Sequence, residues 1–253
     1  MKILLGGALG RMGREVTAAA AEAQVEIVCG VDVAYTGQPS DYPIVTAFDQ
    51  ATQKADVLID FSRPSALPEL LQLARKEKMP TVLCATGYNE AELQMIEEAS
   101  REIPVFRSAN MSLGVNVLRH LVQEAARALG EDFDVEIVER HHRMKADSPS
   151  GTALMLYDSV KEATETLRQP VFGRYGRTAQ RQPGEVCIHA VRGGTITGEH
   201  EVCFYGDGEE LILTHRAEKR SLFARGALRA AAFLMDKPAG KYDMQDLIEE
   251  MLR

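Results

Sequence analysis

Short apolar runs alternate with amphipathic segments over the first hundred residues of the chain. Runs of about four to eight apolar residues bounded by turn residues are typical of strands that are covered on both faces. Such runs predict strands at residues 2–6, 25–31, 56–61, 81–85 and 105–106. Helical segments lie between them, and this β-α alternation predicts an α/β fold with a Rossmann-type, doubly wound parallel sheet.

Three of the intervening helices have recognisable features. Residues 16–23 are rich in alanine, a strong helix former. A second helix ends near Lys78 and has its apolar positions at Leu67, Leu70, Leu71 and Ala74. Asn89 and Glu92 stand three residues apart in the pattern of a capping box, which predicts the start of a third helix.

The pattern changes near Ser112. Residues 115–129 predict a long helix with one apolar face, and residues 133–138 alternate apolar and acidic side chains as a strand with one covered face would. Residues 168–184 have little periodicity and are expected to form a loop. Strands follow at 186–191, 195–205 and 211–214 without helices between them, which predicts an antiparallel or mixed sheet in a second, α+β domain.

Two further helices, at residues 223–234 and 244–252, close the chain. They either return to the first domain or extend the second. The hydrophobic pattern alone leaves both alternatives open.

Composition and charge narrow the class of partner. The 253 residues are 45% hydrophobic and 26% charged, which is ordinary for a globular chain, and the net charge of -8 argues against nucleic acid or an anionic membrane as the main partner. The amino terminus has neither a secretory leader nor a membrane span. We therefore expect a cytoplasmic protein.

The four cysteines, Cys29, Cys84, Cys187 and Cys203, are widely spaced and form no C-x-x-C motif. Reduced structural thiols are expected rather than disulfides or a zinc site. No metal site is predicted.

The first predicted strand runs into a glycine-rich turn and then a helix. Gly7, Gly10 and Gly13 have the spacing G-x-x-G-x-x-G, a variant of the dinucleotide fingerprint in which glycines let the backbone approach a pyrophosphate. Asp32 ends the next strand about 20 residues later, where an acid accepts hydrogen bonds from ribose. Such turns also occur without a ligand, and Asp32 alone would be a loop aspartate. Together they predict a dinucleotide-binding βαβ unit.

Loops that follow parallel strands should line the ligand crevice, because ligands bind at the carboxyl ends of such strands. These loops are residues 61–64, 84–87 and 108–111. The residues expected to contact the cofactor are Gly7, Gly10, Arg11, Met12, Gly13, Asp32, Phe61, Arg63, Cys84, Ala85, Thr86, Ser108, Ala109, Asn110 and Met111.

The stretch of residues 139–153, E-R-H-H-R-M-K-A-D-S-P-S-G-T-A, combines two histidines, a lysine and a helix start. Ser150 is a predicted N-cap, because the apolar-periodic positions Leu154, Tyr157, Val160 and Leu167 follow it. The amides of Gly151 and Thr152 would then lie in the first helical turn, where they suit a carboxylate or a phosphate.

His141, His142 and Lys145 suit an anionic substrate that must be protonated. Histidine titrates near neutrality, and a lysine beside another cation can have a lowered pKa. Taken singly, a His-His pair at a strand end is more often a loop pair, and P-S-G-T is merely a good cap. Their joint occurrence with a cofactor motif favours a catalytic site.

The chain resembles the dihydrodipicolinate reductases, also called 4-hydroxy-tetrahydrodipicolinate reductases, essentially from end to end. Residues 139–153 are the most specific part of the resemblance. The other shared motifs are G-x-x-G-R-M-G at residues 7–13, D-F-S-R-P at 60–64, A-T-G at 85–87, A-N-M-S-L-G-V-N at 109–116 and R-G-G at 192–194.

The resemblance implies a dinucleotide-binding domain at residues 1–112 and 220–253. It implies a substrate-binding and oligomerisation domain at 113–219, and a homotetramer. The implied reaction is reduction of a small cyclic imine dicarboxylate by NADH or NADPH in lysine (diaminopimelate) biosynthesis. His141 and Lys145 take the proton-transfer roles, while His142 and the S-G-T residues Ser150, Gly151 and Thr152 hold the substrate carboxylates.

Two departures from the family pattern affect the expected cofactor contacts. Many relatives follow the ribose acid with an arginine, whereas this chain has Asp32-Val33-Ala34. A 2'-phosphate facing Asp32 should be repelled, so NADH is expected to be used at least as well as NADPH, although Arg11 could still reach a phosphate. Cys84-Ala85 stands where relatives often have Gly-Thr, which changes the contacts expected near the nicotinamide.

Two other functions remain open at this point. One is another nicotinamide-linked imine or amino-acid oxidoreductase, against which the double-histidine stretch argues. The other is a non-catalytic NAD-binding regulator, which would have no need to keep His141, His142 and Lys145 together.

Overall fold

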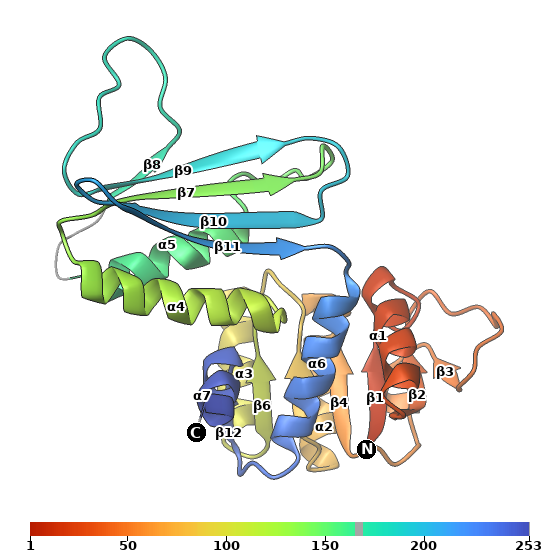
Figure 1. The fold of residues 1–253 in the computed structure, drawn as a ribbon. Coiled ribbons are helices and arrows are strands. Elements are labelled where there is room, and N and C mark those ends of the chain that lie inside the picture. The colour runs from red at the N-terminus through yellow and green to blue at the C-terminus, as the bar shows by residue number, and fades with distance from the viewer. Residues whose placement is uncertain (165–168, 253) are drawn as a thin grey trace. The chain divides into compact units, whose positions relative to one another are not determined.

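The computed structural model describes residues 1–164 and 169–252, which form two compact units (Figure 1). Unit 1 comprises Met1–Leu113 together with the chain from Arg220 onward, and unit 2 comprises Gly114–Lys219. The boundary between residues 113 and 114 lies one residue after the expected boundary between residues 112 and 113. Leu167, predicted on the helix face, and Arg168, at the start of the predicted loop, lie outside the described residues.

Unit 1 is built on a seven-stranded sheet in which every recorded pairing is parallel. Its strands are β1 (Lys2–Gly6), β2 (Glu26–Val31), β3 (Ile44–Val45), β4 (Val57–Asp60), β5 (Thr81–Leu83), β6 (Pro104–Arg107) and β12 (Gly240–Tyr242). Their order is β12-β6-β5-β4-β1-β2-β3, so the winding direction reverses beside β1. The predicted doubly wound sheet is confirmed.

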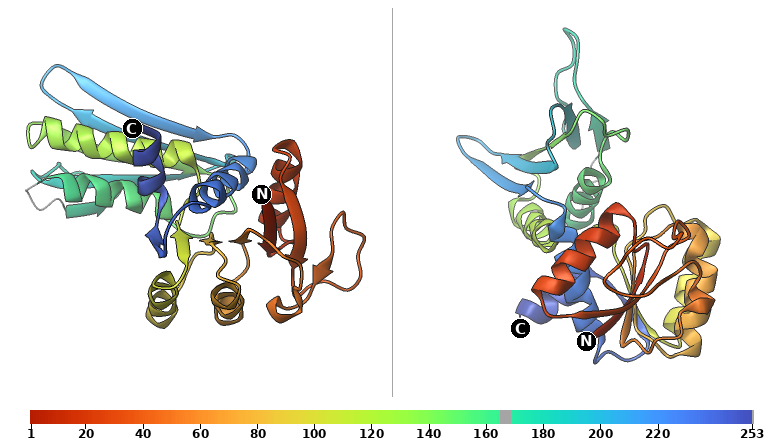
Figure 2. Two further views of the ribbon diagram at one scale, coloured as in Figure 1. Left: turned by 90° about the horizontal axis from the view of Figure 1, so that it is seen from below. Right: turned by 90° about the vertical axis from the view of Figure 1, so that its right-hand side faces the viewer.

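Helices cover both faces of this sheet (Figure 2). On one face pack α1 (Arg11–Glu22), α6 (Ser221–Leu234) and α7 (Met244–Leu252), and on the other α2 (Leu67–Lys76) and α3 (Glu90–Ser100). Ile3 and Leu5 of β1 face the first layer, whereas Leu4 faces the second. Burial on both faces explains the continuous apolar runs. Because α6 and α7 pack here, the last two helices return to unit 1.

The capping box predicted for α3 is present. The Asn89 side chain accepts a hydrogen bond from the Glu92 amide at 2.9 Å, and the Glu92 carboxylate accepts one from the Asn89 amide at 2.7 Å. The sequence analysis did not predict β3 and β12, which have two and three residues and pair with β2 and β6.

Unit 2 has a five-stranded mixed sheet of order β11-β10-β7-β9-β8. Its strands are β7 (Asp134–His141), β8 (Gln169–Phe172), β9 (Glu185–Arg192), β10 (Gly198–Tyr205) and β11 (Glu210–Ala217). β9 runs parallel to β7 and β8, whereas β10 runs antiparallel to β7 and β11. The predicted mixed sheet is confirmed.

Two helices, α4 (Leu113–Leu129) and α5 (Gly151–Ala163), cover one face of that sheet. Val135 and Ile137 of β7 point toward them, as do Val202 and Phe204 of β10. The same alternation assigns the remaining residues of β7 and β10 to the helix-facing or the outward side of the sheet.

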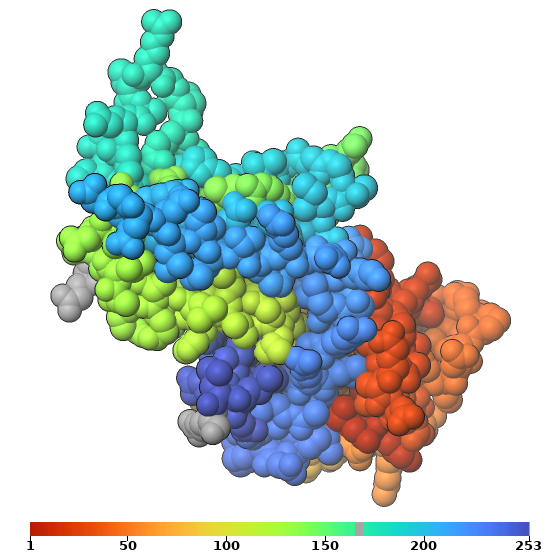
Figure 3. Space-filling model, viewed as in Figure 1, coloured from red at the N-terminus to blue at the C-terminus, as the bar shows by residue number. Residues whose placement is uncertain are grey.

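The prediction of a loop throughout residues 168–184 is wrong at β8. The segment contains Pro170 and little apolar periodicity, but it pairs with β9 as an edge strand, the position where proline is tolerated. The residues between β8 and β9 project from the body of unit 2 (Figure 3).

Among the described residues, no helix combines the length and the apolar character needed to cross a membrane.

Candidate active site

The glycine turn lies at the carboxyl end of β1. Gly7 has φ of +73°, and its amide donates to the Val31 carbonyl at 2.8 Å. A Cβ on Gly7 would lie 2.8 Å from the Phe61 carbonyl oxygen, and one on Gly13 would lie 2.2 Å from the Gly7 oxygen. Both positions therefore require glycine, the first for its backbone conformation and the second because α1 packs directly on the turn.

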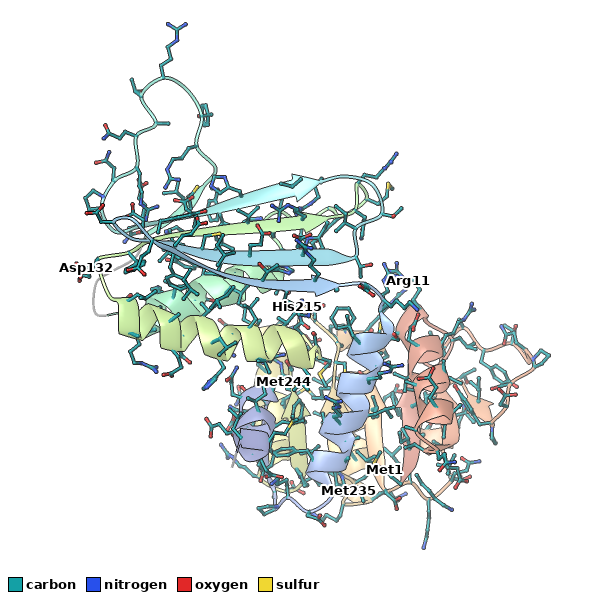
Figure 4. All side chains as sticks on the ribbon, viewed as in Figure 1. Met1, Arg11, Asp132, His215, Met235 and Met244 are labelled. Atoms are coloured by element: carbon teal, nitrogen blue, oxygen red, sulfur yellow. The ribbon has the colours of Figure 1, made fainter. Side chains whose placement is uncertain are left out.

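Helix α1 begins in the same turn. Gly10 is its N-cap and offers no side chain to the first helical amides. These amides thus form a place where a phosphate can bind. Arg11 is exposed at the amino end of α1 (Figure 4), whereas Met12 packs against the core.

Asp32 follows β2 and is tied to the glycine turn. One carboxylate oxygen accepts a hydrogen bond from the Leu9 amide at 2.9 Å, and the other accepts one from the Ala34 amide at 2.9 Å. The structure thus brings the predicted ribose acid and the predicted pyrophosphate turn together.

The other predicted cofactor residues follow the carboxyl ends of β4, β5 and β6, which are adjacent parallel strands. They therefore share one edge of the sheet with the glycine turn. Arg63, Thr86 and Ala109 are exposed there, and Phe61, Ser108 and Asn110 are half-buried. Cys84, Ala85 and Met111 are buried, so their side chains belong to the core and only their backbone could face a ligand.

A buried carboxyl, missed by the sequence pattern, lies beneath the glycine turn. Asp60 is 1% exposed, accepts a hydrogen bond from the Ser62 amide at 3.1 Å, and would lie 2.3 Å from a Cβ on Gly6. Burial raises the pKa of Asp60 to about 6, against the opposing effect of the bonds from Ser62. Burial also raises the pKa of the neighbouring Cys84 thiol, and the negative charge of Asp60 adds to this.

In unit 2, β7 brings Glu139 and His141 to the helix-facing side of the sheet. They continue the alternation of Val135 and Ile137 and are buried, His141 being the last residue of the strand. His142 follows directly and is half-exposed. The two histidines therefore lie at and just past the strand end, as predicted.

Glu139 is fully buried and accepts bonds from three directions. His141 Nδ1 lies 2.7 Å from Oε2. Arg192 Nη1 and Nη2 donate to Oε2 and Oε1 at 2.7 and 2.8 Å, and the Ser150 amide donates to Oε1 at 2.9 Å. Burial favours a raised pKa, but these bonds outweigh it and the pKa of Glu139 is lowered.

Ser150 is the N-cap of α5, as predicted. Its Oγ accepts a hydrogen bond from the Ala153 amide at 3.2 Å and lies 3.0 Å from His200 Nε2. Ser150 is 2% exposed and its amide is bonded to Glu139, so it lies beneath the helix start. A Cβ on Gly151 would meet no atom within 4 Å, so open space lies in front of that residue, while Thr152 is half-buried.

Lys145 lies in the loop between β7 and α5. Its amide donates to the His142 carbonyl at 3.1 Å, and its Nζ lies 2.8 Å from Asp147 Oδ2. The hydrogen bond from Lys145 lowers the pKa of Asp147, and the Lys145 charge also acts on His141.

Two histidine rings meet in a T-shaped arrangement inside the site. The centroids of His141 and His200 are 5.1 Å apart, with their planes at 73°. Burial lowers the pKa of His141, opposed by Glu139 and reinforced by Lys145 and Arg192. Burial lowers the pKa of His200 to about 3, and the charge of His141 adds to this, so His200 is neutral at physiological pH.

Sequence reasoning missed the roles of Glu139, Arg192 and His200. Glu139 continues the inward-facing alternation of β7, and a glutamate at such a position needs a buried partner. His200 likewise shares the inward face of β10 with Val202 and Phe204. Only the strand register, which pairs Glu139 with His200 and His141 with Arg192, places these residues around one point.

A second cluster lies on the opposite face of the same sheet. Ligand atoms of Glu136, Cys187 and His189 come within 4.8 Å of one another. Both Glu136 oxygens accept bonds from Arg174, and Oε2 lies 2.9 Å from His189 Nε2. The carboxylate is therefore neutralised by arginine, which opposes a cation there.

Two family models match the chain in succession. Dihydrodipicolinate reductase, N-terminus, matches residues 1–111, and dihydrodipicolinate reductase, C-terminus, matches residues 114–248. The 4-hydroxy-tetrahydrodipicolinate reductase of Caldanaerobacter subterraneus subsp. tengcongensis is 49% identical over 251 residues, or 99% of each chain. That of Clostridium tetani is 44% identical over 98% of this chain and 97% of its own.

Solved structures share the fold at low sequence identity. A dipicolinate-bound dihydrodipicolinate reductase from Paenisporosarcina sp. TG-14 superposes with a TM-score of 0.78 at 22% identity, covering 96% of this chain and 97% of that one. The WlbA dehydrogenase of Thermus thermophilus, in complex with NAD and UDP-GlcNAcA, gives a TM-score of 0.53 at 14% identity over 95% and 96% of the two chains.

Proposed function

The chain belongs to the dihydrodipicolinate reductase family, and on that premise we propose that His141 and Lys145 transfer the proton in its reaction. That reaction is the nicotinamide-dependent reduction of 4-hydroxy-tetrahydrodipicolinate to tetrahydrodipicolinate in lysine biosynthesis. A reduced nicotinamide supplies the hydride when it is bound. A proton must then add to the carbon beside the new C–H bond, and water leaves if the hydroxylated ring is the immediate substrate.

One observation carries the proposal. A buried, carboxylate-bound histidine ends β7 beside an α5 N-terminus that opens at Gly151. The His141 ring is held in place, and a positioned acid of this kind contributes about 10²-fold or more to a rate. Lys145, in the adjoining loop, is the second proton-transfer group of the proposal.

The same arrangement supports a role in binding carboxylates. The first amides of α5, at Gly151 and Thr152, together with His142, would hold the substrate carboxylates. Ser150 is buried, and its amide and its hydroxyl both have hydrogen-bond partners within the protein. It therefore contributes by holding the helix start in place and not by donating to the substrate itself.

Unit 1 fits a dinucleotide through its own residues. Gly7 and Gly13 permit the tight turn and the close packing of α1 on it, and Gly10 leaves the start of α1 open. The Asp32 carboxylate, held against the turn by the Leu9 amide, would accept hydrogen bonds from the ribose. The remaining strand-end loops would contact the rest of the cofactor.

We expect NADH to serve at least as well as NADPH. A 2'-phosphate beside Asp32 would be repelled, because Val33 and Ala34 provide no guanidinium to pair with it. Oxidation of NADH and of NADPH would be followed separately, with substrate generated by condensing pyruvate with aspartate semialdehyde. A strong NADPH preference would contradict the Asp32 argument, and no turnover with either cofactor would contradict the reductase reaction.

Lys145→Ala tests the proton-transfer role. We expect kcat to fall about 10²-fold or more while NADH still binds, because Lys145 is not among the cofactor residues. Binding is measured by NADH fluorescence and turnover by loss of NADH absorbance. Lys161→Ala, at an exposed lysine in the last turn of α5, is the matched control and should keep full turnover. Unchanged turnover in Lys145→Ala would refute the assigned role.

A homotetramer and a cytoplasmic location also belong to the proposal. The outward face of the unit 2 sheet carries the exposed apolar residues Val191, Tyr205 and Ile212, which suit contact with other copies of the chain. The four cysteines are buried and unpaired, which accords with a reducing compartment.

A further inference from the structure

We propose that Glu139 is the positioning residue of the site, holding the His141 ring for proton transfer and joining it to the start of α5. This inference rests on the proposed function, in which His141 donates a proton and α5 binds a carboxylate. Glu139 itself is fully buried and is not proposed to contact the substrate or the transferred proton. Its effect must pass through His141 and Ser150.

The contact with Glu139 fixes which nitrogen of His141 is available. A carboxylate only accepts hydrogen bonds, so the 2.7 Å contact requires the hydrogen on Nδ1. The exchangeable proton of the ring is therefore on Nε2. Gly198 of β10 leaves room on that side, since a Cβ there would lie 3.0 Å from Nε2. The Glu139–His141 pair thus sets both the tautomer and the orientation of the ring.

The second oxygen of Glu139 fixes the carboxylate-binding part of the site. Oε1 accepts the Ser150 amide at 2.9 Å, one residue before α5 begins. The ring and the helix start therefore bond to opposite oxygens of one side chain. Any shift of Glu139 would move the proton donor relative to the bound carboxylate, and such misplacement is costly in catalysis.

Arg192 makes the buried charge tolerable and extends the link toward Lys145. Its two terminal nitrogens bind both oxygens of Glu139, and Nη2 also donates to the Asp147 carbonyl at 2.8 Å. The Asp147 carboxylate is paired with Lys145. A bidentate arginine on a buried carboxylate gives a rigid geometry as well as charge balance.

The charges around His141 make Glu139 decisive for its proton. Lys145 from the loop, Arg192 from β9 and His200 from β10, with His215 beyond it on β11, face His141 or its neighbours. These four groups are all basic, and Glu139 is the acidic group that His141 contacts. Removing its charge therefore disfavours the imidazolium form, and the form that donates a proton is lost at a lower pH.

Glu139→Gln is the test. We expect kcat at neutral pH to fall about 10- to 100-fold, and the alkaline limb of the kcat profile to move to lower pH, with the affinity for NADH unchanged. Glu139→Asp keeps the charge and should restore part of the rate and the position of that limb. NMR titration of His141 in the same variants measures its protonation without relying on turnover.

Glu136→Gln is the matched control. Glu136 stands on the same strand, faces the other side of the sheet, and is likewise bound by arginine and histidine. Its loss should lower stability without moving the alkaline limb or the His141 titration. An equal shift in this variant would reduce the role of Glu139 to a structural one and overturn the proposal.

The outcomes also separate this proposal from the proposed function. If the wild-type protein reduces no substrate, the reductase role of the site fails, while a His141 titration that shifts in Glu139→Gln still supports the positioning role. An unshifted His141 titration in an active Glu139→Gln enzyme overturns the positioning role alone. If Glu139→Gln does not fold, kcat of Glu139→Asp is compared with that of the wild type. The shorter side chain cannot reach both His141 and the Ser150 amide, so kcat should fall, and a wild-type kcat contradicts the proposal.

Discussion

At the scale of single residues, two buried acids, Glu139 and Asp60, differ in how burial of a carboxylate charge is compensated. Glu139 keeps its charge because an arginine, a histidine and an amide bind it. The carboxylate of Asp60, beneath the glycine turn, is bonded to Ser62 alone among the described residues, and burial raises its pKa to about 6. A buried charge is stable when it is paired and otherwise takes up a proton.

Asp60 should make the protein less stable as pH rises. The folded pKa of about 6 exceeds the ordinary value of 3.8, so the folded state binds the proton more tightly and stability falls between about pH 4 and pH 6. The difference between these two pKa values corresponds to about 3 kcal/mol of unfolding free energy. Asp60→Asn can keep the bond from the Ser62 amide without ionising, so its stability relative to wild type should increase over that range.

Urea unfolding of the wild type and of Asp60→Asn at pH 4.5 and pH 7.5 measures how the stability difference between the two proteins changes with pH. Asp56→Asn, at an exposed aspartate just before the same strand, is the control and should change the pH dependence much less. A wild-type protein and an Asp60→Asn variant that respond to pH identically would show that Asp60 does not titrate in this range.

At the scale of elements, two of the helix starts that have side-chain caps differ in what the cap affects. Asn89 and Glu92 cap α3 at the surface of unit 1. Ser150 caps α5 from beneath the candidate site and also contacts His200. The first cap serves the helix alone, whereas the second also holds a helix start proposed to bind substrate.

Ser150→Ala should therefore affect both stability and substrate binding. The lost cap is expected to cost about 1 kcal/mol or more of unfolding free energy and to raise KM for the dicarboxylate, since the first turn of α5 loses its fixed geometry. Asn89→Ala should cost a similar free energy with KM unchanged. Steady-state kinetics and denaturant unfolding of both variants provide the comparison. An equal rise in KM for the two would mean that capping matters only through global stability.

At the scale of the whole molecule, the residues proposed to bind the cofactor and those proposed to transfer the proton lie in two units with separate cores. The glycine turn and Asp32 belong to unit 1, and the His141 cluster belongs to unit 2. The helix-facing side of the unit 2 sheet is used by that cluster and by the core. Its outward side is left with exposed apolar residues, Val191 and Ile212 being 45% exposed each.

Ile212→Glu should weaken the proposed tetramer. The substitution places a charge among exposed apolar residues on the outward face of β11, and burying it between copies would be costly. Sedimentation velocity should show smaller species than the wild type at the same concentration. Leu93→Glu, at an exposed leucine of α3 in unit 1, is the control and should leave the assembly unchanged. A wild-type protein that sediments as a monomer would contradict the tetramer directly.

The sequence by itself determined most of the elements and where the candidate site residues fall on them. Continuous apolar runs specify the parallel strands, G-x-x-G-x-x-G specifies the turn, and Ser150 specifies where α5 begins, because each depends on residues close together in the chain. The doubly wound sheet, the mixed second sheet and the histidine pair at a strand end follow from these local signals.

Only the tertiary structure decided which distant residues complete the site. Strand register brings Arg192 and His200 from β9 and β10 to Glu139, across about 50 to 60 residues of sequence, and no local pattern encodes that pairing. The same holds for β3, β8 and β12, which exist only because a neighbouring strand supplies their hydrogen bonds. Side-chain identity states what a residue can do, and the fold decides what it meets.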